Sequence, residues 1–293
     1  MRARAKVCLV LLWALQSASS SGGCGPGATR PVVHGERQEE LANAPRSNAA
    51  RAQRLIELFK QAGLSDIRKQ PIEGHGGRYN IIATLPGDVA ETIVVGAHVD
   101  FVARGGGLIG LMAQGQGVID NWSGATLVAS LAKALQTSSH HHTFVFVGFD
   151  IEEFGLVGSK YYVSQLSPEE RSSILGMVNL ECLGVSSLKI YRNGSAGDLV
   201  TLATRVGAEK SIPVQPMILR DTPADSAAFL RAGIPAITFH SLETQDFKLL
   251  HSYSDRYNAI DPDLFEQQYR YLLAYLLALD ARGGRMSPEV GGG

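Results

Sequence analysis

Residues 143–159 read TFVFVGFDIEEFGLVGS, an apolar run that ends in acidic residues and leads into a helical pattern. Val and aromatic residues dominate the first part of this stretch, which is typical of a buried strand. The same succession of strand and helix recurs along the chain. This alternation predicts an α/β fold with a mostly parallel mixed β-sheet, flanked by helices on both faces.

The other elements are predicted in the same way, from apolar runs and from helical spacing. The predicted strands are residues 79–85, 92–97, 143–149, 174–180, 188–191 and 234–239. The predicted helices are residues 45–63, 122–135, 156–166, 198–207, 225–232 and 264–279. No internal repeat or linker interrupts residues 44–282, so we expect them to form a single domain.

The composition is that of a globular protein, with 45% hydrophobic and 19% charged residues. Lys and Arg number 27 against 28 acidic residues, so the chain lacks the basic excess that nucleic-acid binding requires. We therefore expect no nucleic-acid partner. The three cysteines, Cys8, Cys24 and Cys182, are too few for a disulfide framework or a four-thiolate zinc site.

Residues 1–23 have the order of a secretory signal peptide, with basic residues, the apolar run 7–15 and then small residues. This run is shorter than the roughly 20 residues of a membrane span, so we expect a secreted or periplasmic protein without such a span. Cys24 follows directly, and a lipid anchor on this residue stays open. Residues 24–43 are predicted to be a leader, and the glycine-rich residues 283–293 a flexible tail.

Ionisable side chains follow several predicted strands, and ligands of open α/β sheets bind outside the carboxyl ends of the strands. The candidate residues are His98, Asp100, Asp120, Glu152, Glu153, Glu181 and His251. Each has a simpler explanation when taken alone. Asp120 can cap the helix that follows it, and Glu152 with Glu153 can be a solvated pair.

Taken together, these residues favour a metal site. Adjacent carboxylates at the end of an apolar strand repel each other unless a cation is present. Two imidazoles combined with carboxylates suit Zn²⁺, and the number of ligand-type residues suits two ions that share a carboxylate. Glu152 and Glu153 cannot easily point the same way. One of them can therefore bind metal, while the other faces a metal-bound water, the nucleophile, as a base.

These residues resemble the co-catalytic zinc aminopeptidases typified by bacterial leucyl aminopeptidases, a family that also includes glutaminyl cyclases and some carboxypeptidases. The resemblance covers about residues 44–280. It is carried by residues 97–100 (AHVD), 120–124 (DNWSG), 149–159 (FDIEEFGLVGS), 179–181 (NLE) and 251–255 (HSYSD). Spaced motifs in the same order are far more specific than any single short pattern.

The resemblance implies two zinc ions per chain. His98 and Glu181 would hold one ion, Glu153 and His251 the other, and Asp120 would bridge both. This set would make residues 44–282 a zinc peptidase domain. The run at residues 140–142 (HHH) is instead expected to be a solvated turn at the opposite end of its strand.

The resemblance also assigns roles beyond the metal ligands. Asp100 would orient His98, as partners of metal ligands commonly do. Glu152 would be the general base, and Asp225 would lie near the substrate. The chain departs from the family pattern at Glu181, where many members have Asp, and at Ser226, where a His is usual. No Tyr lies between residues 213 and 239 to stabilise an oxyanion.

The implied function is a zinc-dependent exopeptidase, first of all an aminopeptidase that acts on peptides with a free N-terminus and prefers an apolar first residue. The departures leave a glutaminyl cyclase and a carboxypeptidase or dipeptidase open on the same fold. A member that binds zinc or peptide without catalysis is the remaining alternative. The sequence does not indicate the oligomeric state.

Overall fold

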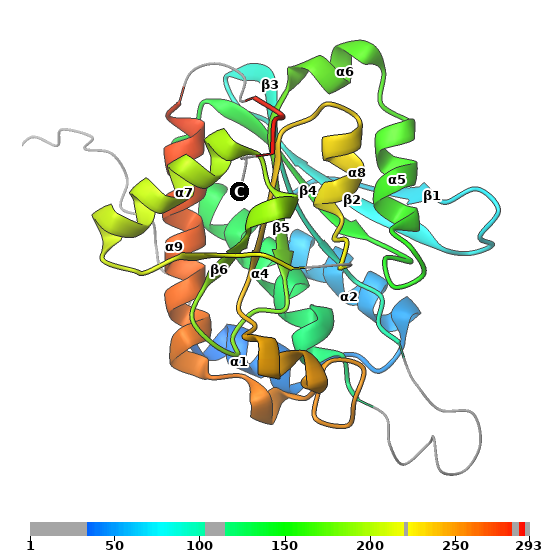
Figure 1. Ribbon diagram of the computed structural model, residues 1–293. Coiled ribbons are helices and arrows are strands. Elements are labelled where there is room, and N and C mark those ends of the chain that lie inside the picture. Colours follow the sequence, from blue (N-terminus) through cyan, green and yellow to red (C-terminus); the bar gives the residue numbers. More distant parts are fainter. Residues whose placement is uncertain (1–33, 103–114, 220–221, 283–286, 291–293) are drawn as a thin grey trace, which may run out of the picture.

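The computed structural model describes residues 34–102, 115–219, 222–282 and 287–290, so the predicted signal peptide and Cys24 lie outside the described residues. The described chain folds into an eight-stranded mixed sheet with helices on both faces (Figure 1). The predicted α/β class is therefore confirmed. No helix within the described ranges is long and apolar enough to cross a membrane.

The central strands of the sheet run parallel and bring their carboxyl ends to one edge. The strands are β1 (Asp66–Pro71), β2 (Tyr79–Leu85), β3 (Val89–His98), β4 (His142–Phe149), β5 (Ile174–Glu181), β6 (Lys189–Tyr191), β7 (Gln215–Met217) and β8 (Ala236–His240). Their order is β1-β2-β4-β3-β5-β8-β6-β7. Strands β4, β3, β5 and β8 are parallel, whereas β1 and β2 pair antiparallel, as do β2 with β4 and β6 with β8.

Two layers of helices enclose the sheet. One face carries α1 (His34–Ala42), α2 (Asn48–Gln61), α4 (Ser123–Leu135), α7 (Gly197–Lys210) and α9 (Pro262–Asp280). The other carries α5 (Val157–Ser164) and α8 (Ser226–Arg231), and the short α6 (Pro168–Ser173) leads into β5. Shorter helical turns are η1 (Val118–Trp122), η2 (Arg192–Gly194), η3 (Thr244–Leu249) and η4 (Tyr257–Ala259).

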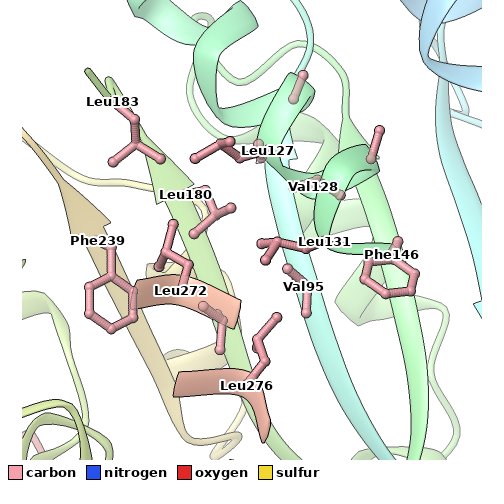
Figure 2. Packing of buried hydrophobic residues seen from close by; sticks show 14 of the residues in the cluster. Val95, Leu127, Val128, Leu131, Phe146, Leu180, Leu183, Phe239, Leu272 and Leu276 are labelled. Atoms are coloured by element: carbon pink, nitrogen blue, oxygen red, sulfur yellow. The ribbon is translucent and has the colours of Figure 1, made fainter. Parts of the chain in front are cut away.

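The larger hydrophobic core lies between the sheet and helices α4 and α9 (Figure 2). Side chains such as Val95, Leu131 and Leu276 meet there without solvent exposure. Burying such a side chain contributes about 1.5–3 kcal/mol relative to leaving it exposed. On the opposite face, Gly96 makes room for Phe149, because a Cβ at Gly96 would lie 2.5 Å from that ring. This packing fixes the ends of the central strands.

The segment predicted as a leader is helical in its described part. Helix α1 places Leu41 in the core, and its Arg37 forms a buried ion pair with Glu266 of α9. The packed unit therefore begins before residue 44. The sequence did not indicate this, because α1 is mostly polar and has few apolar residues to set a period.

Part of the predicted flexible tail is also attached to the body. The N–H of Ser287 donates to Asp198 at 3.1 Å, and the N–H of Gly197 donates to the carbonyl of Glu289 at 2.8 Å. Residues 287–290 thus dock at the start of α7. The flexibility of the tail stays a prediction.

The histidine run differs from the solvated turn that was predicted. His142 opens β4 and is buried, with its Nδ1 3.1 Å from Asp280 Oδ1 of α9. The same carboxylate accepts the backbone N–H groups of His141 and His142. Because this partner lies 138 residues away along the chain, the local pattern could not show that the third histidine belongs to the core.

Candidate metal centre

Three candidate ligands meet at the carboxyl edge of the parallel strands. His98 ends β3 and Glu181 ends β5, and His98 Nε2 lies 3.0 Å from Glu181 Oε1. Asp120, in η1, places Oδ1 3.1 Å from the same nitrogen. His98, Asp120 and Glu181 therefore form one compact group of possible metal ligands.

A second group shares Asp120 with the first. Its other oxygen, Oδ2, lies 3.1 Å from His251 Nε2, and Glu153 Oε2 lies 2.8 Å from that nitrogen. Within each group the ligand atoms lie within 4.8 Å of one another. One carboxylate thus faces two imidazoles in two adjoining groups, which is the arrangement of a bridging ligand.

The residues present fit a divalent cation. Glu153 Oε1 is buried without a hydrogen-bond partner, and His98 and Asp120 are both buried. Carboxylates removed from water in this way are unfavourable unless positive charge balances them. Nitrogen and oxygen donors in this combination are the ligand types that zinc takes in proteins.

The pKa values show how the protein balances these charges with protons. Hydrogen bonds with Asp120 and Glu153 raise the pKa of His251 to about 10. Burial acts to lower the pKa of His98, but Glu181 and Glu152 hold it well above its usual value. Both imidazoles are therefore in the doubly protonated, positively charged form at neutral pH. A cation bound here would replace the extra protons.

These shifts predict how the stability of the protein without metal depends on pH. Because the folded pKa of His251 is about 10 and its ordinary value is 6.5, its stabilising contribution is complete below pH 6.5. That contribution is lost as the pH rises toward 10. Glu152, whose pKa burial raises to about 10, acts in the same direction. In chelator, Tm is expected to fall from pH 6.5 to pH 10.

Differential scanning calorimetry across this range checks the prediction. The His251→Gln variant serves as the comparison, because it removes the titrating imidazole while keeping a polar side chain. Its Tm is expected to fall less steeply with pH. A Tm in chelator that rises between pH 6.5 and 10 would show that the imidazoles are not held protonated in the folded protein.

The turn after β4 sends Glu152 and Glu153 to different places. Ile151 adopts φ 59°, a left-handed conformation that β-branched residues rarely take. Asp100 holds the turn, since its Oδ1 and Oδ2 accept the N–H groups of Glu152 and Glu153 at 3.0 and 3.4 Å. Glu153 joins the second ligand group, whereas Glu152 belongs to neither.

Asp100 also meets His98, but mainly through its backbone. His98 Nδ1 lies 3.0 Å from the carbonyl oxygen of Asp100 and 3.5 Å from its Oδ1. The main chain therefore orients the imidazole, and the carboxylate chiefly orients the Glu152–Glu153 turn. The sequence predicted that Asp100 orients His98, but it did not predict that Asp100 holds the Glu152–Glu153 turn.

The sequence also missed residues that hold Asp120 in place. Asp255 accepts the N–H groups of Ile119 at 2.6 Å and Asp120 at 3.4 Å. Asn121 donates to the carbonyl of Leu180 at 2.8 Å, which ties the same segment to the end of β5. Asp255 lies in a motif that the resemblance identified, so its position was visible, although its role was not.

A buried arginine holds the backbone that leads into η1, the turn that carries Asp120. Arg51 of α2 donates from Nη2 to the carbonyls of Gln116 and Gly117, the latter at 2.8 Å. Its guanidinium lies 4.1 Å from the ring centre of Phe101, and burial lowers its pKa to about 10. No local signal distinguishes this arginine from others in an amphipathic helix, so only the structure reveals it.

A cavity of about 420 Å³ opens onto both ligand groups and onto Glu152. Much of its remaining wall is apolar. The apolar lining includes Leu156, Tyr191, Leu219, Pro223, Leu242, Phe247 and Leu250. Tyr191 comes from β6, outside the range in which a tyrosine was sought. A larger cavity of about 610 Å³ lies between α1, α2 and α4, away from the ligand groups.

Asp225 is not among the residues that line the cavity, although its neighbours Pro223 and Ala224 are. Its side chain is fully buried, and burial raises its pKa to about 7. The position of Asp225 near the substrate stays a prediction. The direction of a side chain at the start of a short helix such as α8 cannot be read from the sequence.

Comparison with known proteins identifies a family for this chain. The model of peptidase family M28 matches residues 80–276. Probable leucine aminopeptidase 2 of Aspergillus oryzae is 32% identical over 201 residues, which cover 63% of this chain and 38% of that protein. The chain spans about a third of the length of the curated relatives that it matches.

Solved structures share the fold. The LapA aminopeptidase of Legionella pneumophila aligns with a TM-score of 0.71 and 20% identity, over 85% of this chain and 71% of that one. The glutaminyl cyclase of Porphyromonas gingivalis aligns with a TM-score of 0.66 and 17% identity, over 83% of this chain and 96% of that one. Both candidate ligand groups lie within the residues that the family model matches.

Proposed function

The chain belongs to peptidase family M28, and from that premise we propose that it is a zinc-dependent aminopeptidase, an exopeptidase that releases the N-terminal residue of peptides. One observation carries the proposal. Two ligand groups share Asp120, and Glu152 stands beside them in the same cavity without belonging to either. That combination supplies both a metal site and a base.

We propose that the chain holds two zinc ions. His98, Asp120 and Glu181 would hold one ion, and Asp120, Glu153 and His251 would hold the other. Zinc bound at such a site polarises a peptide carbonyl and makes a nearby water more acidic. Asp120 is essential to both ions in this arrangement.

Glu152 performs the proton transfers in this proposal. Without metal, burial keeps Glu152 protonated, but cations bound at the two ligand groups would favour its ionised form. The carboxylate would then take a proton from the water whose oxygen attacks the carbonyl carbon, and give that proton to the nitrogen that leaves as the C–N bond breaks. Asp100 fixes the backbone of Glu152 through the hydrogen bond of 3.0 Å. A buried partner thus holds the main chain that carries the base.

The cavity wall indicates the substrate. Its apolar portion suits an apolar first side chain. None of the described lining residues is Lys or Arg, the residues that would pair with a C-terminal carboxylate. This favours an aminopeptidase over a carboxypeptidase.

A substrate panel tests the proposal. The zinc-loaded protein is incubated with leucyl-p-nitroanilide, its N-acetyl derivative, a peptide that begins with Leu and one that begins with Gln, and products are identified by mass spectrometry. We expect release of free leucine from the unblocked substrates and none from the acetylated one. Loss of ammonia from the Gln peptide without hydrolysis would identify a cyclase instead, and no turnover of any substrate would overturn the proposal.

A further inference from the structure

His240 closes β8 directly beside a candidate metal ligand. It pairs in register with Glu181 of β5, and paired residues on neighbouring strands project to the same face of a sheet. Neighbouring strands lie about 4.8 Å apart, so the imidazole stands one strand away from the Glu181 carboxylate. His240 is 2% exposed and lines the cavity.

The hydrogen bonding of His240 determines which nitrogen carries the proton. Its Nδ1 accepts the N–H of Leu242 at 3.3 Å. A neutral imidazole that accepts at one nitrogen carries its hydrogen on the other, so Nε2 is the donor. Burial, with a smaller effect from Lys189, lowers the pKa of His240 to about 4, and the ring is neutral at physiological pH.

This donor has no acceptor among the residues that the structure describes. Nε2 is buried and makes no hydrogen bond to any described residue. A buried N–H without an acceptor is unfavourable, and proteins keep such groups mainly where they serve a function. The ring is not placed as a metal ligand, because neither ligand group includes it. Ligation through Nε2 would also move the hydrogen to Nδ1 and break the bond from Leu242.

We propose that Nε2–H of His240 donates a hydrogen bond to the carbonyl oxygen of the scissile peptide bond, and that this bond strengthens as the oxygen becomes negative. The inference rests on the proposed peptidase function. A donor that is fixed beforehand and aimed at developing charge stabilises the transition state more than the bound substrate. His240 would then stabilise the oxyanion, the role for which no tyrosine was found between residues 213 and 239.

Two substitutions separate the two nitrogens of the ring. In His240→Asn the side-chain oxygen can accept from Leu242 as Nδ1 does, but nothing reaches the place of Nε2. In His240→Gln the longer side chain returns an N–H near that place. We expect His240→Asn to lower kcat about 100-fold with KM changed less than threefold, and His240→Gln to recover at least tenfold of that loss. The zinc content of both variants is expected to match the parent.

A binding measurement provides a readout other than turnover. Leucine phosphonic acid mimics the tetrahedral anion, whereas leucinol has the amine and side chain without an oxyanion. By calorimetry, His240→Asn is expected to bind the phosphonic acid about 100-fold more weakly and leucinol unchanged.

Several results would overturn the inference. These are a His240→Asn variant as active as the parent, loss of zinc in that variant, or equal weakening of both ligands. If Tyr191 stabilised the oxyanion instead of His240, kcat would fall in Tyr191→Phe and stay unchanged in His240→Asn. If the parent itself hydrolyses no free-amine substrate, the proposed function has failed. If it hydrolyses them and His240→Asn is unimpaired, only the inference about His240 has failed.

Discussion

Replacing Glu152 by Gln is expected to lower kcat about 10³-fold while the protein keeps its zinc. The substitution preserves the shape of the side chain and removes the group that moves the proton. General acid–base catalysis is worth roughly 10²–10⁴-fold, and 10³-fold corresponds to about 4 kcal/mol of barrier. Because Glu152 belongs to neither ligand group, the ions should remain bound.

Steady-state kinetics with leucyl-p-nitroanilide, together with metal analysis of the same preparation, checks this prediction. Glu169→Gln provides the matched control, since that carboxylate lies exposed on α6, away from the cavity. The control should keep parental activity. Full activity in Glu152→Gln would exclude Glu152 as the base, and loss of zinc from it would make Glu152 a ligand.

Replacing Asp120 by Asn is expected to reduce activity about 10⁴-fold and to weaken binding of both ions together. Its two oxygens lie 3.1 Å from His98 and 3.1 Å from His251, so the two groups depend on one carboxylate. Asn keeps the shape but loses the charge. Metal ions contribute several kcal/mol of charge stabilisation in the transition state, and about 5.4 kcal/mol corresponds to 10⁴-fold.

Thermal unfolding with and without zinc measures the same change independently of activity. A ligand present at 100 times its Kd stabilises a folded protein by about 2.7 kcal/mol, so zinc should raise the Tm of the parent. In Asp120→Asn this increase should be largely lost. Asp88→Asn, at a side chain that is 79% exposed, should keep it. An Asp120→Asn variant that holds two zinc ions would disprove the bridging role.

The central strands were predictable because both of their faces are buried. Strand β4 and strand β5 carry continuous runs of apolar residues, and the predicted ranges differ from the observed ones by a single residue at one end. Strands β1 and β7 were missed. The sequence DIRKQP of β1 is polar and largely exposed at the sheet edge, and β7 is only three residues long, so neither shows the apolar run of a buried strand.

The candidate site was predictable to the extent that strand ends determine it. His98 and Glu181 follow from the rule that parallel strands meet at their carboxyl ends. Asp120 and His251 come from segments without periodicity. The pattern made them candidates, but their roles as ligands followed from the resemblance. Arg51 and His240 were missed, because the role of each depends on contacts with a distant segment of the chain.

The assignment of residues 1–23 as a signal peptide and of Cys24 as a possible lipid anchor stays a prediction. Helix α1 packs on the core and its Leu41 is fully buried, so we expect any cleavage site to lie before Leu41. A cleavage site beyond this residue would remove part of the hydrophobic core.

Anomalous X-ray diffraction at the zinc absorption edge, from crystals grown with zinc, shows directly whether the chain holds two zinc ions and where they lie. We expect two anomalous peaks per chain, one among His98, Asp120 and Glu181, and the other among Asp120, Glu153 and His251. A single peak, or peaks away from the carboxyl edge of the sheet, would contradict the two-zinc centre on which the proposed activity rests.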